Sequence, residues 1–168
     1  RVNWMPWMAA AAGVVLAVLA WMPWGDGRVE PAAAYQSFLS EATDISRASW
    51  GDWDDPEIAG VTGEVLWSES REEGYLRFTG LPENDPTREQ YQLWIIDERG
   101  LANPVTGQSA RIRGAIFNSD GGELIVPIEP SIPVRNAAAF AITIEEPGGT
   151  WVSDMSRRVV IASLGEPG

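Results

Sequence analysis

The chain contains no cysteine, no histidine and no lysine among its 168 residues. Without cysteine there can be no disulfide framework and no thiol chemistry. Without histidine or cysteine, the Ser-His-Asp triad, the Cys-His pair and the usual zinc sites are excluded. The absence of lysine excludes Schiff-base chemistry and the lysine of a phosphate-binding loop. What remains for catalysis is carboxylate chemistry or a metal held by oxygen ligands.

Positive charge is also scarce, since the chain has 12 basic residues, all of them arginine, against 24 acidic residues. Its net charge is −12 and its pI is about 4.3. Binding to nucleic acid needs a basic surface that neutralises phosphates, and this composition offers none. The charge therefore predicts no nucleic-acid partner, and it disfavours contact with an anionic cytoplasmic leaflet.

Residues 4–24 form an uncharged apolar run with a pair of tryptophans at each end. As a helix, these roughly 21 residues would be roughly 31 Å long, close to the thickness of the hydrocarbon core of a bilayer. Tryptophan prefers the interfacial region, so the two pairs mark the two membrane surfaces. A buried core helix is usually shorter, and a signal peptide would end in small residues rather than in Trp-Met-Pro-Trp. The run therefore predicts a transmembrane helix within residues 1–25.

The flanks of this run predict its orientation. Arg1 precedes it, whereas Asp26, Arg28 and Glu30 follow it at the start of an acidic region. The positive-inside rule then places the N-terminus in the cytoplasm and the bulk of the chain outside. The first residue is arginine rather than methionine, which suggests that more protein precedes this sequence.

Residues 26–60 are expected to connect the span to a folded domain. The first few form a short stalk, and Pro31 suits the first turn of a helix because its missing N–H costs nothing there. One apolar stripe at helical spacing predicts an amphipathic helix over residues 31–47; its members are Tyr35, Phe38, Leu39, Ala42 and Ile45. We expect this helix to pack over one edge of the domain. Binding to a partner or to the membrane surface is the alternative, and the mixed charges weaken the membrane version.

An acidic loop with two tryptophans, Trp50 and Trp53, follows the predicted helix. Its carboxylates could offer hard oxygen ligands to calcium; they are Asp52, Asp54, Asp55 and Glu57. The spacing lacks the glycine and the distal glutamate of a helix-loop-helix calcium site. The loop is therefore predicted to be solvated, with its tryptophans folded onto the core, and no metal is expected to be needed for folding.

From residue 61 onward the hydrophobic pattern changes to that of β-strands. The pattern predicts about seven strands, at 61–68, 75–79, 91–97, 110–118, 123–128, 138–145 and 158–163. The first two strands should form a hairpin, and the contiguous apolar run at 91–97 predicts a central strand buried on both faces. The expected fold is mainly β, with an immunoglobulin-like antiparallel sandwich over residues 61–168.

Two motifs in this region resemble those of a known family. The first combines Gly-Leu-Pro with Tyr-Gln-Leu-Trp-Ile-Ile-Asp; its residues are Gly80, Leu81, Pro82, Tyr91, Gln92, Leu93, Trp94 and Asp97. The second reads Phe-Ala-Ile-Thr-Ile-Glu-Glu-Pro-Gly-Gly-Thr; its residues include Phe140, Thr143, Glu145, Gly148 and Gly149. In this order and after a single apolar run, they resemble the C-terminal domain of the anti-sigma-K factor (RskA-type) family over residues 61–163.

The resemblance implies a regulatory protein with no chemistry of its own. The chain would be the membrane-spanning and extracytoplasmic part of an anti-sigma factor in the bacterial inner membrane, with its β domain acting as a sensor. An envelope protease would cut outside the membrane, a cut within the membrane would follow, and the sigma factor would be released. Family members bind the sigma factor through a cytoplasmic N-terminal domain, often with a zinc-binding motif. Here the sigma factor is expected as a partner only through that missing domain.

The motif residues are predicted to be structural rather than catalytic, and no cofactor is expected. The double glycine suits a turn that needs positive φ between two strands. After it the chain departs from the family pattern, because Trp151-Val152-Ser153-Asp154 stands where relatives often have a Pro-Thr segment. An anchored binding module for envelope glycan or protein, using Trp50, Trp53 or Trp151, is the alternative function. An anchored enzyme is disfavoured, because no carboxylate pair is identifiable.

Overall fold

The computed structural model describes residues 30–51, 60–98 and 111–164, which form one α-helix and eight β-strands. The chain divides into two compact units, residues 1–30 and 31–168, and all of these elements belong to the second. Their bounds are α2 (Pro31–Glu41), β1 (Ile45–Ser49), β2 (Thr62–Ser68), β3 (Glu73–Thr79), β4 (Gln90–Asp97), β5 (Arg111–Phe117), β6 (Glu123–Ile128), β7 (Ala137–Glu145) and β8 (Arg158–Ser163).

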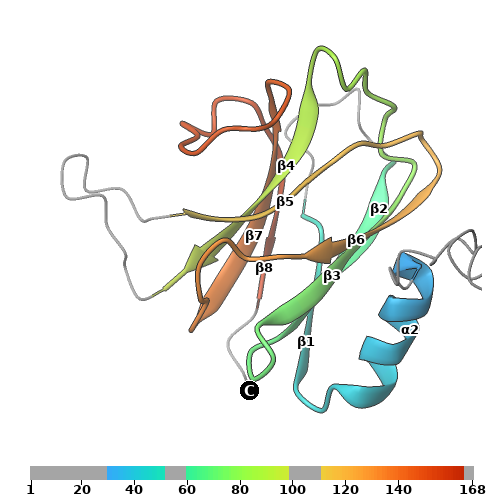
Figure 1. Ribbon diagram of the computed structural model, residues 1–168, viewed down its shortest axis with the longest axis vertical. Helices are drawn as coiled ribbons and strands as arrows, with labels where there is room; N and C mark the ends of the chain where they lie inside the picture. The colour runs from blue at the N-terminus through green and yellow to red at the C-terminus, as the bar shows by residue number, and fades with distance from the viewer. Residues whose placement is uncertain (1–29, 52–59, 99–110, 165–168) are drawn as a thin grey trace, which may run out of the picture. The chain divides into compact units, whose positions relative to one another are not determined.

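The strands form two four-stranded sheets in which every pair is antiparallel. One sheet has the order β1-β2-β3-β6 and the other has the order β5-β4-β7-β8 (Figure 1). The prediction of a mainly β, antiparallel domain is confirmed, as is the hairpin of its first two predicted strands, β2 and β3. The immunoglobulin-like part is not confirmed. An immunoglobulin domain has the sheets ABED and CFG, which place its second and third strands, B and C, in different sheets. Here the second and third strands, β2 and β3, are neighbours in one sheet.

The two sheets share one hydrophobic core built from alternate residues of their strands. β2 and β3 contribute Val65 and Leu76, whereas β4 and β7 contribute Leu93 and Ile142; none of these side chains is exposed to solvent. Aromatic rings join the layers, with the Trp67 and Phe140 centroids 5.8 Å apart and the Phe78 and Phe117 centroids 6.0 Å apart. Such ring pairs stabilise a core beyond the area that they bury.

β4 is the central strand of its sheet, as the contiguous apolar run predicted. It pairs with β5 on one side and with β7 on the other. Five consecutive residues from Tyr91 to Ile95 are buried, so both faces of the strand are covered. One face meets the shared core, and the other lies under the β7–β8 connection, residues 146–157.

The predicted helix over residues 31–47 is wrong in its C-terminal part. α2 ends at Glu41, and Ile45–Ser49 form β1, an eighth strand that the apolar stripe did not predict. The chain turns at Asp44, whose carboxylate accepts a hydrogen bond from the Ser68 hydroxyl. β1 then covers the free edge of β2 with five antiparallel pairs. Since the backbone groups of an edge strand need partners, pairing with β2 outweighs continuation of the helix.

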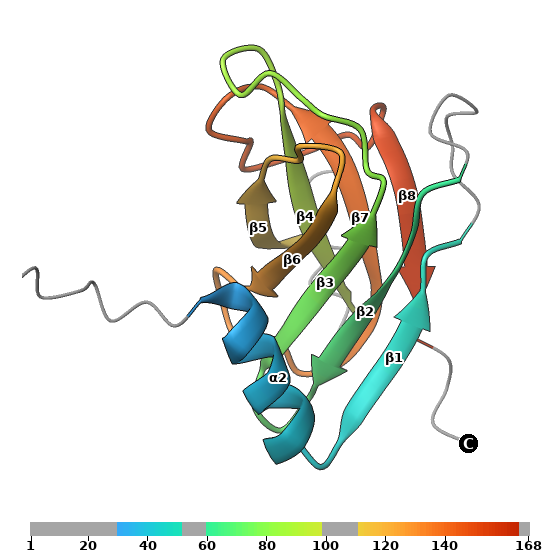
Figure 2. The same ribbon diagram turned by 90° about the vertical axis from the view of Figure 1, so that its right-hand side faces the viewer.

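α2 packs on the outer face of the sheet that contains β1, β2, β3 and β6, as both views show (Figures 1 and 2). Its Tyr35 and Phe38 are buried against Leu66 and Tyr75 from the sheet. The ring of Tyr75 lies 5.7 Å from that of Tyr35 and 5.2 Å from that of Phe38. These four residues form a second cluster, which we call the helix cluster, separate from the shared core.

Within residues 30–51, 60–98 and 111–164, no helix has both the length and the apolar character needed to cross a bilayer. The apolar run at 4–24 lies outside these described residues, so the transmembrane helix stays a prediction. The acidic residues 52–57 and Trp53 also lie outside the described residues, so the predictions for this loop, including the possible calcium site, stay predictions.

Candidate functional site

The Gly-Leu-Pro motif fixes the crossover from β3 to β4. Gly80 adopts a φ of 79°, a left-handed conformation that suits glycine. Leu81 is fully buried, and its carbonyl accepts a hydrogen bond of 2.6 Å from the Ser119 hydroxyl. The Pro82 carbonyl accepts a hydrogen bond of 3.0 Å from the hydroxyl of Tyr91, the first residue of the second half of the motif. The two halves of the motif are therefore hydrogen-bonded to each other at one end of the sandwich.

Burial, together with the smaller effect of the nearby Glu89 carboxylate, raises the pKa of Tyr91 to about 12. Because the pKa of Tyr91 in the folded state lies above the ordinary value of 10.0, its contribution to the free energy of unfolding is fully present below pH 10. We expect that contribution, about 2 kcal/mol, to be lost as the pH rises from 10 to 12. Urea unfolding across this range should show that the free energy of unfolding falls less steeply with pH in Tyr91→Phe than in the wild type. At neutral pH, loss of the hydroxyl should make this variant less stable by about 1 kcal/mol. Equal slopes in the two proteins would contradict the assignment.

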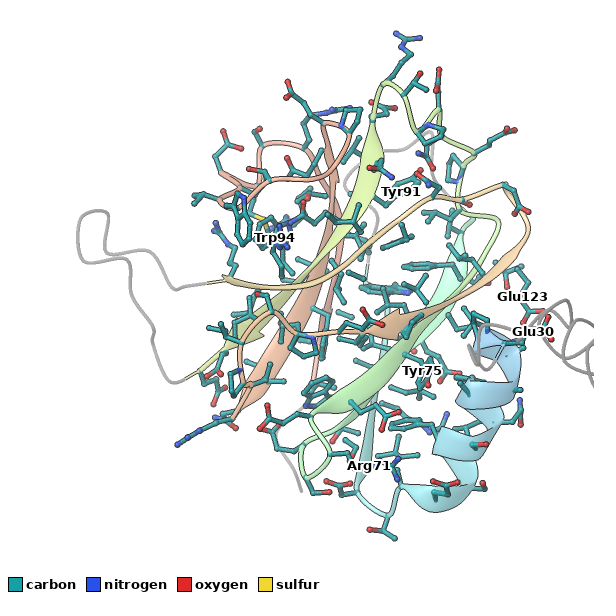
Figure 3. The ribbon with its side chains drawn as sticks, in the orientation of Figure 1. Glu30, Arg71, Tyr75, Tyr91, Trp94 and Glu123 are labelled. Carbon is teal, nitrogen blue, oxygen red and sulfur yellow. The ribbon has the colours of Figure 1, made fainter. Side chains whose placement is uncertain are left out.

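Gln92 and Trp94 point away from the shared core, yet both are buried, at 0% and 1% exposure. Figure 3 shows Trp94 on the side of its sheet that the β7–β8 connection covers, whereas Tyr75 lies on the side of the other sheet that faces α2. The indole N–H of Trp94 donates to the Thr143 hydroxyl at 2.9 Å, and that hydroxyl donates to Glu145 at 2.7 Å. The first motif is therefore hydrogen-bonded directly to the second.

Thr143→Val is expected to destabilise the domain by about 1–3 kcal/mol, because it leaves the buried N–H of Trp94 without an acceptor at nearly constant volume. Urea unfolding measures this difference in the free energy of unfolding. The matched control is Thr62→Val on β2, where the side chain is exposed and little change is expected. Equal stabilities of the two variants would show that the indole finds another acceptor.

Gln92 uses its whole amide group to hold the β7–β8 connection. Its Nε2 donates to the Thr150 carbonyl at 2.9 Å, and its Oε1 accepts from the Thr150 N–H at 2.8 Å. Gly148 and Gly149 adopt φ values of 87° and 71° on the approach to this point. A Cβ on Gly149 would lie 2.4 Å from the Gln92 Oε1 and 2.5 Å from the Cδ1 of Ile116. The double glycine therefore serves both the turn and a close approach to the sheet.

This anchored connection presents two exposed apolar side chains, Trp151 and Val152, which are 78% and 77% exposed. The indole ring of Trp151 lies over the guanidinium of Arg113, 4.0 Å from ring centroid to Cζ. The Thr150 hydroxyl donates to the Val152 carbonyl and accepts from the Val152 N–H, so the backbone is held on both sides of Trp151. The two motifs thus converge on a structured, solvent-facing tip.

The sequence model of the family described as "Anti-sigma-K factor rskA, C-terminal" matches residues 7–152 of the chain. The chain belongs to this family. The match includes both motifs and ends at the exposed tip. Comparisons with curated proteins and with solved structures give no significant match.

Membership of the anti-sigma-K family implies a regulatory role, which is not typically enzymatic, with a sigma factor as the kind of partner that such proteins have in general. Among the described residues, no group of three or more acidic side chains is arranged to hold a metal ion. In this family member the remaining motif residues are buried. Asp97 is 1% exposed and accepts from the Arg135 N–H at 3.1 Å, and Phe140 lies in the shared core.

The three tryptophans proposed as ligand contacts differ in their surroundings. Trp50 is partly buried and stacks on Phe78, with a centroid distance of 4.9 Å and an interplanar angle of 10°. Trp53 lies outside the described residues. Trp151 alone among the described tryptophans is largely exposed. Of the predicted contacts, the structure therefore offers Trp151 to solvent, and it places Trp50 against the core.

Sequence reasoning missed an ion-pair ladder on the outer face of the sheet that carries α2. Arg47 on β1 pairs with Glu64 on β2 at 3.2 Å, and Arg77 on β3 pairs with Glu123 on β6 at 2.9 Å. Arg77 also lies 4.0 Å from Glu64, which links the two pairs into one row. These groups are partly exposed, so each pair contributes little to stability. Each strand supplies one charge to this row, and Glu64 meets Arg77 only through the register between β2 and β3, so no local pattern signalled it.

Proposed function

We propose that the chain is the tether and the regulatory domain of a membrane-anchored anti-sigma factor. The β domain would lie outside the cytoplasmic membrane and control release of a sigma factor by regulated proteolysis. A protease of the envelope would cut first in the stalk at residues 25–34, and a second cut within the apolar run would follow. The domain would act by shielding the stalk.

The observation that carries this proposal is the extent of the family match. It begins at residue 7, inside the apolar run, and continues through the stalk into the β domain. The matched region therefore includes most of the apolar run, the stalk and the β domain as far as residue 152. An apolar run of this length next to an acidic folded domain supports a membrane tether.

The position of α2 supports the shielding step. α2 begins at Pro31, so the last four residues of the proposed stalk, 31–34, form the first turn of the helix. It is held by the helix cluster and by an exposed ion pair of 3.5 Å between Glu41 and Arg71. Such a pair contributes little, so the few aromatic contacts supply most of the docking energy. The helix can therefore detach while the shared core stays folded.

The test is to map the ends produced when the full chain is expressed in bacterial membranes and the envelope is stressed. We expect the first cut within residues 25–34, at or before the first turn of α2, because strands paired in a sheet resist proteases and the end of a helix opens more readily. A matched variant with residues 25–29 replaced by five prolines should slow this cut, since a proline-rich backbone fits protease clefts poorly. A first cut inside residues 61–163 would overturn the shielding mechanism.

A further inference from the structure

The exposed apolar side chains of the described part of the chain gather around one strand. Four large ones stand out there: Ile116, Ile132, Trp151 and Val152. Ile116 belongs to β5, Gly149 packs on Ile116, and Trp151 lies over Arg113 of β5. Ser131, the neighbour of Ile132, donates its N–H to the Arg113 carbonyl at 2.9 Å. A clustered set of this kind marks an interaction surface, whereas scattered ones do not.

A groove runs along β5 from this cluster to the edge of β6. At one end, a hollow of about 180 Å³ is lined by Arg113, Ile116, Glu129 and Ser131. It shares Ala115, Ile116 and Glu129 with a second hollow of about 300 Å³, whose further lining includes Phe117, Leu124 and Ile125. β5 is an edge strand of its sheet, and β6 is an edge strand of the other. The groove is therefore elongated, with a polar end and an aliphatic end.

Arg113 is the cationic group of the polar end, which it lines together with the carboxylate-bearing Glu129. Acidic residues outnumber arginines two to one in this chain, and Arg47, Arg71, Arg77 and Arg157 each pair with a carboxylate. Within the described residues, Arg113 has no carboxylate within 4.0 Å and instead supports the ring of Trp151. A guanidinium that is positioned but lacks an ion pair offers a ready partner to an incoming carboxylate.

The anchoring of the tip adds a second reason to regard it as a binding surface. The buried amide of Gln92 and the Thr150 hydroxyl fix the backbone on both sides of Trp151. A side chain that is already ordered loses little entropy when a ligand arrives. Tryptophan and arginine are also the residues that most often dominate the energy of a protein interface.

We propose that the groove along β5, together with Trp151 and Arg113, binds an extended segment of a protein partner that carries a carboxylate beside aliphatic side chains. The carboxylate pairs with Arg113, one face of the segment packs on Trp151, and the aliphatic side chains fill the hollow between β5 and β6. The aliphatic lining disfavours a saccharide, because sugar hydroxyls would be buried there without hydrogen-bond partners. This surface stands on the geometry of the domain and does not depend on the proteolysis proposal.

The experiment selects random ten-residue peptides by mRNA display on the immobilised full chain in neutral detergent. The expected consensus has Asp or Glu next to aliphatic residues at alternate positions. A labelled consensus peptide then reports affinity by fluorescence anisotropy. Trp151→Ala should weaken binding about 30-fold, and Arg113→Gln should weaken it about tenfold and remove the preference for an acidic residue. The matched control is Arg88→Gln, an exposed arginine on the β3–β4 crossover, with unchanged binding expected.

Two results would overturn the proposal. One is the absence of any enriched peptide, or an enriched peptide whose affinity is the same in Trp151→Ala and in the wild-type chain. The other comes from a parallel titration with uronic-acid oligosaccharides. If these bind in a Trp151-dependent way while no peptide does, the occupant is a saccharide. Far-UV circular dichroism and a thermal unfolding midpoint that match those of the wild type verify that each variant is folded, which the exposure of Trp151 leads us to expect.

Discussion

A Trp94→Asp variant is expected to lose the folded β domain and to be cut in membranes at a higher basal rate than the wild-type chain. Trp94 is 1% exposed, and its indole N–H is hydrogen-bonded to Thr143. The substitution removes a large buried ring and places a carboxylate in a buried position, at a combined cost of about 5 kcal/mol or more. That is comparable with the whole stability of a typical domain. Circular dichroism and the mapping of cleaved ends measure the two effects.

Trp151→Asp is the matched control, because it makes the same chemical change at a tryptophan that is 78% exposed. It forfeits the contact with Arg113, worth about 1 kcal/mol or less, and should leave the domain folded and the basal cleavage unchanged. If Trp94→Asp unfolds the domain without raising cleavage, the domain does not shield the stalk and must signal by binding a partner.

A Phe38→Asp variant is expected to release α2 and to expose the stalk while the shared core remains folded. Phe38 is 1% exposed and belongs to the helix cluster rather than to the shared core. Loss of its burial together with burial of a carboxylate costs about 3–5 kcal/mol, and the helix can escape that cost by detaching. Hydrogen exchange should show faster exchange confined to residues 31–41, and membrane assays should show increased cleavage in the stalk.

Gln36→Asp is the control for this variant, since it introduces the same side chain at an exposed position of the same helix. Both its hydrogen exchange and its cleavage should match the wild type. If Phe38→Asp raises exchange across β4 and β7 as well, α2 and the sandwich unfold as one unit, and the separate release of the helix is wrong.

The sequence predicted the strands well because their apolar residues alternate, and it predicted β4 as central because the run at 91–97 is apolar on both faces. The helix boundary was missed for a specific reason. Ile45 does pack in the same region as Tyr35 and Phe38, so it fits the helical stripe even though it lies on β1. Periodicity records which side chains are buried together, but it does not record that β2 needed a partner along its edge.

The candidate site could be predicted only in part for a similar reason. The motifs indicated a turn at the double glycine and a buried strand around Trp94. The bond between Gln92 and Thr150 joins residues 58 positions apart, and it depends on the register between β4 and β7. The contact of Arg113 with Trp151 depends in turn on where that connection lands. Pairings of this kind arise from the assembled fold, and no local pattern encodes them.

The separation of the helix cluster from the shared core sets how the domain responds to mechanical force. A pull applied at Pro31 loads α2 first, and the contacts of Tyr35 and Phe38 break one after the other rather than together. The next resistance is β1, whose Ala48 belongs to the shared core. The domain therefore yields stepwise from its N-terminal end: a weak pull frees one helix, and only a stronger one peels a strand from the sheet.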